Sequence, residues 1–142
     1  YGANSRVTFP FRRIEKMRDV EPGERRIDGL VTSVHLLFPT ASVSVLSKHT
    51  NLAILEPLSP TSSKWVLYRM VNRAGDGQGI PLQEAQRDAL FVGDSGQVED
   101  REAARAIQES VASNANSHFT FGYFEKAIVN FHQHLSKYLD SQ

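Results

Sequence analysis

The sequence contains no cysteine, and this absence removes several classes of protein at once. Disulfides cannot form, and an iron–sulfur cluster cannot be held, because every such cluster needs cysteine thiolates. An excess of either charge is also missing, since 16 Lys and Arg balance 16 Asp and Glu. Nucleic acids and anionic membranes need a basic partner surface, so we expect no nucleic-acid or membrane partner.

Long apolar runs are missing too. No segment approaches the roughly 20 apolar residues of a membrane-spanning helix, and the first residues lack the apolar core of a signal peptide. We therefore expect a cytoplasmic protein. The chain of 142 residues is 40% hydrophobic, which suits a single soluble domain over residues 1–142. The chain has no initiator Met and begins almost at once with a strand pattern, so we expect this domain to be partial, incomplete at its N-terminus.

Residues from about 6 to 72 have the pattern of β-strands. Apolar and polar side chains alternate, as in residues 41–47, and turn-forming residues separate the alternating segments. A short polar loop at residues 48–50 predicts a hairpin between the strands on either side. Connections as short as these predict an antiparallel sheet, because parallel strands need long crossovers.

Residues from about 81 to 139 have the pattern of helices. One helix is expected from Pro81, and a second from about Glu99 to Ala112. The last helix has the clearest periodicity, with apolar residues three and four apart at Phe124, Ile128, Phe131, Leu135 and Tyr138. Strands followed by helices predict an α+β fold with the helices on one face of the sheet.

Three possible sites have simpler explanations. The glycine run GDGQG at residues 75–79 lacks the Lys of a phosphate-binding loop and is interpreted as a connector. No two histidines have the spacing that places two imidazoles on one helix face; His49 is expected in a hairpin loop and His118 in an interhelical loop. No Gly-x-Ser-x-Gly motif indicates a nucleophilic serine.

Acidic residues gather where the second predicted helix begins, at Asp94, Glu99, Asp100 and Glu102. Carboxylates are favoured at a helix N-terminus, because the helix dipole is positive there. This explanation needs no ligand.

The order and spacing of several motifs add a second interpretation. The segments VEDREAARAIQESVAS and FTFGYFEKAIVNFHQHLSKYL resemble the C-terminal end of the catalytic domain in α subunits of Rieske-type ring-hydroxylating oxygenases. That family has a pair of acidic residues and a Gln eight residues after the second of them, and Asp100 and Gln108 have this spacing. Glu125, Phe131 and His132 match positions in the family's final helix. Residues 35–71 resemble its FPN strand and the hairpin beyond it, although Thr40 replaces the Asn.

This resemblance implies a helix-grip (START-like) fold, in which an antiparallel sheet packs on a long C-terminal helix. It places Asp100 as the carboxylate of a 2-His-1-carboxylate site for non-haem Fe(II). The family's two His ligands and its [2Fe–2S] Rieske domain lie upstream, and their motifs do not occur in these residues. We therefore expect the isolated chain to hold no catalytic iron and to be inactive.

The implied activity is oxygenation of an aromatic ring, with O2 activated at the iron. Electrons would come from NAD(P)H through a reductase and a ferredoxin, and other α subunits and a β subunit would be partners. Apolar candidates for the substrate pocket are Phe9, Phe11, Val43, Val45, Leu52, Ile54, Leu90 and Phe91, for each of which core packing is an equal explanation. The alternative function is a non-catalytic helix-grip domain that carries a hydrophobic small molecule.

Overall fold

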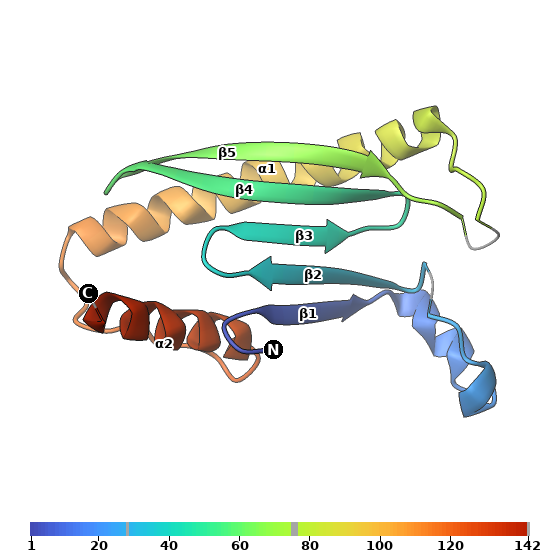
Figure 1. Ribbon diagram of the computed structural model, residues 1–142, viewed down its shortest axis with the longest axis horizontal. Helices are drawn as coiled ribbons and strands as arrows, with labels where there is room; N and C mark the ends of the chain where they lie inside the picture. Colours follow the sequence, from blue (N-terminus) through green and yellow to red (C-terminus); the bar gives the residue numbers. More distant parts are fainter. Residues whose placement is uncertain (28, 75–76, 142) are drawn as a thin grey trace.

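A computed structural model describes residues 1–27, 29–74 and 77–141, and it consists of one antiparallel sheet and two helices (Figure 1). The five strands lie in sequence order, each paired with the next. Their bounds are Ser5–Pro10 (β1), Val31–Leu37 (β2), Ala41–Val45 (β3), His49–Ser59 (β4) and Ser62–Val71 (β5). The α+β fold and the antiparallel sheet predicted from the sequence are therefore confirmed.

The connections between strands are short, with one exception. The predicted hairpin joins β3 to β4, and its turn is closed by a hydrogen bond from Leu46 N to His49 O. The connection between β1 and β2 is longer and contains two 3-10 helices, Arg12–Met17 and Pro22–Glu24. In Figure 1 this connection projects beyond the end of the sheet.

The helices differ from the prediction in two ways. A single helix of 31 residues, α1 (Leu82–Ala112), replaces the two expected ones, so the helix start expected at Glu99 is wrong. Gly93 and Gly96 lie inside α1, and glycine inside a helix costs only about 1 kcal/mol, which does not end a helix that has no proline. The C-terminal helix α2 (Lys126–Asp140) has 15 residues, so the long helix of this fold is α1.

The two helices lie at opposite ends of the row of strands, one near β4 and β5 and the other near β1. Helix α1 passes across one face of the sheet at β4 and β5, whereas α2 lies beside β1 (Figure 1). Asn130 of α2 donates a hydrogen bond to Ser5 Oγ of β1 at 3.1 Å, and the ring of Phe38 lies 5.5 Å from that of Phe131 and 5.6 Å from that of Tyr138. The ends of the sheet are thus held by different helices.

The strand register shows which side chains face α1. Residues paired across an antiparallel sheet share a face, and successive residues alternate between faces. His49 contacts α1, so its face, which we call the α1 face, also carries Asn51 of β4 and Arg69 of β5, the two being directly paired. The opposite face, which we call the open face, carries Val43, Val45, Leu52, Ile54, Tyr68 and Met70.

The buried core is small. Among the described residues, only Ala85, Ala89 and His49 are buried, and all three lie where α1 meets the turn between β3 and β4. Much apolar surface is left open, including Tyr68 at 54% exposure and Met70 at 47% on the open face. Exposed apolar patches of this kind are typical of surfaces that interact with other molecules.

Candidate functional site

The junction between α1 and β4 is built on a buried histidine. His49 is 2% exposed, and its Nδ1 lies 2.8 Å from Asp88 Oδ2 on α1. The same carboxylate oxygen accepts a hydrogen bond of 3.1 Å from the backbone N–H of Lys48. A carboxylate only accepts hydrogen bonds, so Nδ1 carries a proton and donates a hydrogen bond to Asp88. Asp88 therefore fastens the first turns of α1 to the start of β4.

The sequence prediction for His49 is wrong. It was expected in a hairpin loop, but β4 begins at His49 itself, and the small residues Ala85 and Ala89 let α1 approach closely enough to cover it. The spacing of Ala85, Asp88 and Ala89 places them on one face of the helix, but it does not show which strand that face contacts.

An ion pair borders the junction on its exposed side. Lys48 Nζ lies 2.6 Å from Glu84 Oε2, one helical turn before Asp88. The hydrogen bond from Lys48, and then its positive charge, hold the pKa of Glu84 below its ordinary value of 4.5. Glu84 is half exposed, so this pair adds little to the binding of α1.

Two buried side-chain atoms on β4 have no hydrogen-bond partner among the residues that the structure describes. They are His49 Nε2 and Asn51 Oδ1, two residues apart on the α1 face. In the neutral tautomer that carries its proton on Nδ1, Nε2 presents a lone pair. Buried polar atoms in folded proteins nearly always have a partner, so this pair of acceptors marks a place where a hydrogen-bond donor fits.

One row of paired residues crosses the whole sheet on the α1 face. The register joins Arg69 to Asn51, Asn51 to Ser44, Ser44 to Val34, and Val34 to Val7. The row is cationic and polar on β5, β4 and β3 and aliphatic on β2 and β1. At its polar end, Arg69 Nη2 lies 3.5 Å from the position that a Cβ on Gly93 of α1 would take. Its guanidinium forms no hydrogen bond or ion pair with the described residues.

Asp100, the expected metal ligand, lies in the interior of α1 and is exposed. Its Oδ2 lies 3.2 Å from the position that a Cβ on Gly96 would take, so the side chain leans back over the preceding turn. In the described parts of the chain, no three His, Cys, Asp or Glu side chains gather as a metal site would require. These residues alone do not fit an iron centre.

The expected pocket residues do not share one surface. Phe9 lies on the α1 face, since it follows Val7 by two residues, but Val43, Val45, Leu52 and Ile54 lie on the open face. Phe11 lies beyond the end of β1, with the guanidinium of Arg13 over its ring at 5.0 Å. Leu90 and Phe91 are exposed on α1, at 61% and 76%. The structure therefore brings no single apolar pocket together from these eight residues.

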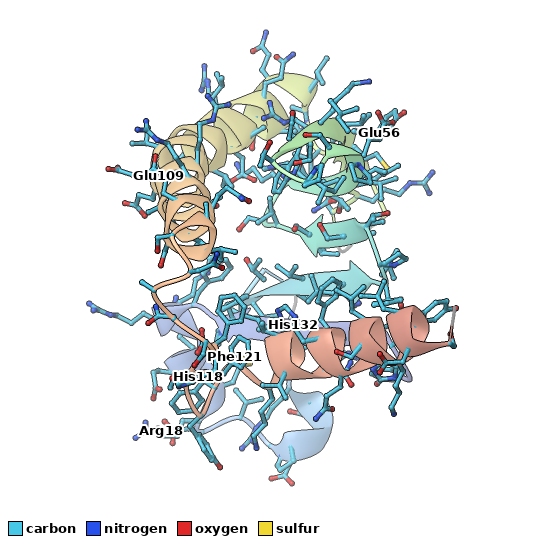
Figure 2. All side chains as sticks on the ribbon, turned by 90° about the vertical axis from the view of Figure 1, so that its left-hand side faces the viewer. Arg18, Glu56, Glu109, His118, Phe121 and His132 are labelled. Atoms are coloured by element: carbon cyan, nitrogen blue, oxygen red, sulfur yellow. The ribbon has the colours of Figure 1, made fainter. Side chains whose placement is uncertain are left out.

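Aromatic rings gather where the connection from α1 reaches α2. His132 of α2 stacks on Phe119 with a ring separation of 6.1 Å and lies 5.6 Å from the ring of Phe121. Figure 2 shows Phe121 and His118 in this connection, close to His132. His134 instead donates a hydrogen bond to the Asn130 carbonyl oxygen at 2.9 Å and lies near Phe38, so His132 and His134 point apart.

The glycine run at residues 75–79 falls partly outside the described residues, at positions 75 and 76. Its described part is a turn, in which Gly77 has φ +82 and donates its N–H to the Ala74 carbonyl. A positive φ explains glycine at position 77 without a phosphate ligand.

Comparison with known proteins gives one clear result. The family model described as ring hydroxylating alpha subunit (catalytic domain) matches residues 7–141. No curated protein and no solved structure matches the chain. Among the described residues, no helix is both long enough and apolar enough to cross a membrane.

Proposed function

The chain belongs to the ring-hydroxylating α-subunit family, as part of the catalytic domain, and from that premise we propose that it contributes an iron ligand and a pocket wall to an aromatic-ring oxygenase. The family match over residues 7–141 carries this proposal, since it covers almost the whole chain. The family implies a mononuclear non-haem iron and a Rieske cluster in the full-length protein, aromatic substrates, and electron-transfer partners.

The proposed ligand is the Asp100 carboxylate. It is exposed, it lies on a regular helix, and it forms no ion pair with the described residues, so it is available to a metal. A facial triad needs two imidazoles besides one carboxylate, and these would come from outside residues 1–142. When bound, the iron would supply the activation of O2; the role of this chain is to hold one carboxylate oxygen at a fixed place.

The proposed pocket wall is the α1 face of the sheet. Helix α1 carries Asp100 and crosses this face at β4 and β5, so the same helix links the carboxylate to this side of the sheet. Electrons would arrive from NAD(P)H through a reductase and a ferredoxin, and the assembly would include other α subunits and a β subunit.

Iron analysis of the intact protein tests this proposal. We expect Asp100→Ala to lower the affinity for Fe(II) by at least about tenfold, which is the effect of losing even an outer partner of a metal ligand. The neighbouring exposed acid, Glu99, provides the matched control, and Glu99→Ala should retain iron and turnover. Asp100→Ala protein with unchanged iron content and activity would refute the assignment.

A further inference from the structure

We propose that two copies of this chain pair edge to edge along β5, antiparallel and about a two-fold axis at Leu67. β5 is the last strand of the sheet, and β4 is the only described strand that pairs with it. Helix α1 crosses a face of the sheet, so it leaves the edge of β5 open in the plane of the sheet (Figure 1). This inference goes beyond the proposed oxygenase function and does not depend on iron binding.

The two edges of the sheet differ in how they are protected. β1 has six residues, ends at Pro10, which has no N–H group, and lies beside α2, whose Asn130 donates a hydrogen bond to Ser5. Short strands, proline and a covering helix are features by which proteins keep edges from pairing. β5 has ten residues and no proline, and all of its residues except Val66 are exposed. A long edge of this kind is a template for a further strand.

The backbone of every second residue of β5 points away from β4. Just beyond the strand, Asn72 donates its N–H to the Lys48 carbonyl oxygen at 3.0 Å, so the even-numbered residues bond to β4. Successive residues of a paired strand present their backbone groups alternately to its two sides. Among the described residues, no other segment bonds to the outward groups, so each outward residue offers one donor and one acceptor. The outward residues are Ser63, Trp65, Leu67, Arg69 and Val71.

A two-fold axis at Leu67 pairs all of these outward residues. Leu67 then faces Leu67 of the second copy, and Trp65 of each copy faces Arg69 of the other. Ser63 and Val71 pair in the same way at the two ends. Each such pair exchanges two backbone hydrogen bonds. A shift by two residues in either direction places one end of β5 beyond the end of its partner strand, so fewer bonds form.

The side chains are complementary in the same register. Directly paired residues share a face of an antiparallel sheet, so Trp65 and Arg69 meet on the α1 face. A guanidinium is attracted to an indole ring and stacks on it. Trp65 is 70% exposed, and Arg69 forms no hydrogen bond or ion pair with the described residues, so both are available. Symmetry forms this contact twice. On the open face Lys64 faces Met70, so no like charges meet directly.

Cysteine cross-linking of the full chain tests the position of the axis. The sequence has no cysteine, so one introduced cysteine can form a disulfide only with a second copy. Residues paired in this register have Cα atoms about 5.5 Å apart, a distance that a disulfide spans. We expect Leu67→Cys to form a covalent dimer on mild oxidation, seen by non-reducing gel electrophoresis. Val71→Cys is the matched control and should remain a single chain. Both side chains are 42% exposed on the α1 face, but two copies of residue 71 would lie roughly 26 Å apart.

A second pair of variants tests the register. Trp65→Cys and Arg69→Cys should each remain a single chain, because the two copies of either residue would lie roughly 13 Å apart. Mixed in equal amounts, the two variants should form a covalent dimer with one copy of each. Linking of each variant with itself would contradict the register and overturn the proposal.

Charge substitution tests the pairing without a covalent link. Leu67→Lys and Leu67→Glu each bring like charges together at the axis, so each should weaken the dimer at least about fivefold. An equal mixture of the two variants should associate again, because opposite charges then meet. Equilibrium sedimentation measures the association, and circular dichroism checks that each variant is folded.

The outcomes decide between edge pairing and other contacts. Equal cross-linking of Leu67→Cys and Val71→Cys would overturn the proposal, and so would a monomeric unchanged chain. Association of Leu67→Lys as strong as that of the unchanged chain would also overturn it and would indicate contact through the open face. Cross-linking specific to Leu67→Cys would support the edge contact even if Asp100→Ala kept its iron and the oxygenase proposal failed.

Discussion

Replacing Asp88 by alanine tests the central contact of this fold. The change removes the oxygen that accepts from His49 Nδ1 at 2.8 Å and from Lys48 N at 3.1 Å. A hydrogen bond to a charged group contributes about 1.5–3 kcal/mol, and a buried donor without an acceptor costs a similar amount. Because His49 is 2% exposed and Asp88 is 20% exposed, water can replace little of this bonding.

We therefore expect Asp88→Ala to lower the free energy of unfolding by about 2–4 kcal/mol, a large share of the roughly 5–15 kcal/mol of a typical domain. Urea denaturation followed by circular dichroism at pH 7 measures the loss as a lower midpoint with an unchanged slope. Asp88→Asn keeps one acceptor oxygen, so its free energy of unfolding should lie between those of the unchanged protein and Asp88→Ala.

The control for this experiment is Glu84→Gln, one turn earlier on α1. It removes the exposed ion pair with Lys48 but leaves His49 covered, so its effect should be much smaller. Hydrogen exchange adds a local measurement: the first turns of α1 should lose protection in Asp88→Ala and keep it in Glu84→Gln. If the two variants have the same urea midpoint, the His49–Asp88 contact does not hold α1 to the sheet.

Two other predictions concern charge and apolar surface. The pKa of Glu84 lies below its ordinary value of 4.5, so its ion pair contributes fully to the free energy of unfolding above that pH. This contribution is lost as the pH falls through the lowered pKa. Glu84→Gln should therefore flatten this part of a plot of stability against pH, and an unchanged plot would contradict the assignment. The open face should make the isolated chain self-associate, and Met70→Lys should reduce the association measured by light scattering, whereas a monodisperse monomer of the unchanged chain would refute this expectation.

The sheet was predictable from the sequence because each strand has a local pattern of alternating apolar and polar residues. Alternation in residues 41–47 and the polar residues after it are sufficient to predict a hairpin, and the structure has one there. The sequence predicts two helices where the structure has one, α1. This prediction was wrong because acidic residues such as Glu99 and Asp100 are as compatible with a helix interior as with a helix start. No proline separates the two predicted helices, and this absence was the better signal.

The site was harder to predict because its contacts join residues far apart in the sequence. His49 and Asp88 are 39 residues apart, and nothing near either residue shows that they meet. The face that each pocket candidate occupies depends on the register between strands, which shifts every side chain to the other face if it changes by one residue. The family resemblance predicted the kind of protein, but only the register shows that Phe9 and Val43 lie on opposite faces.

The length of α1 has a mechanical consequence. The helix is anchored to β4 near its beginning, at Ala85, Asp88 and Ala89, and its residues from Val98 to Ala112 are all exposed. At 1.5 Å per residue, Asp100 lies roughly 17 Å beyond Ala89 along the axis. Because the contact at His49 is so far from Asp100, a tilt of α1 by about 5° there would move the Asp100 backbone by roughly 1.5 Å.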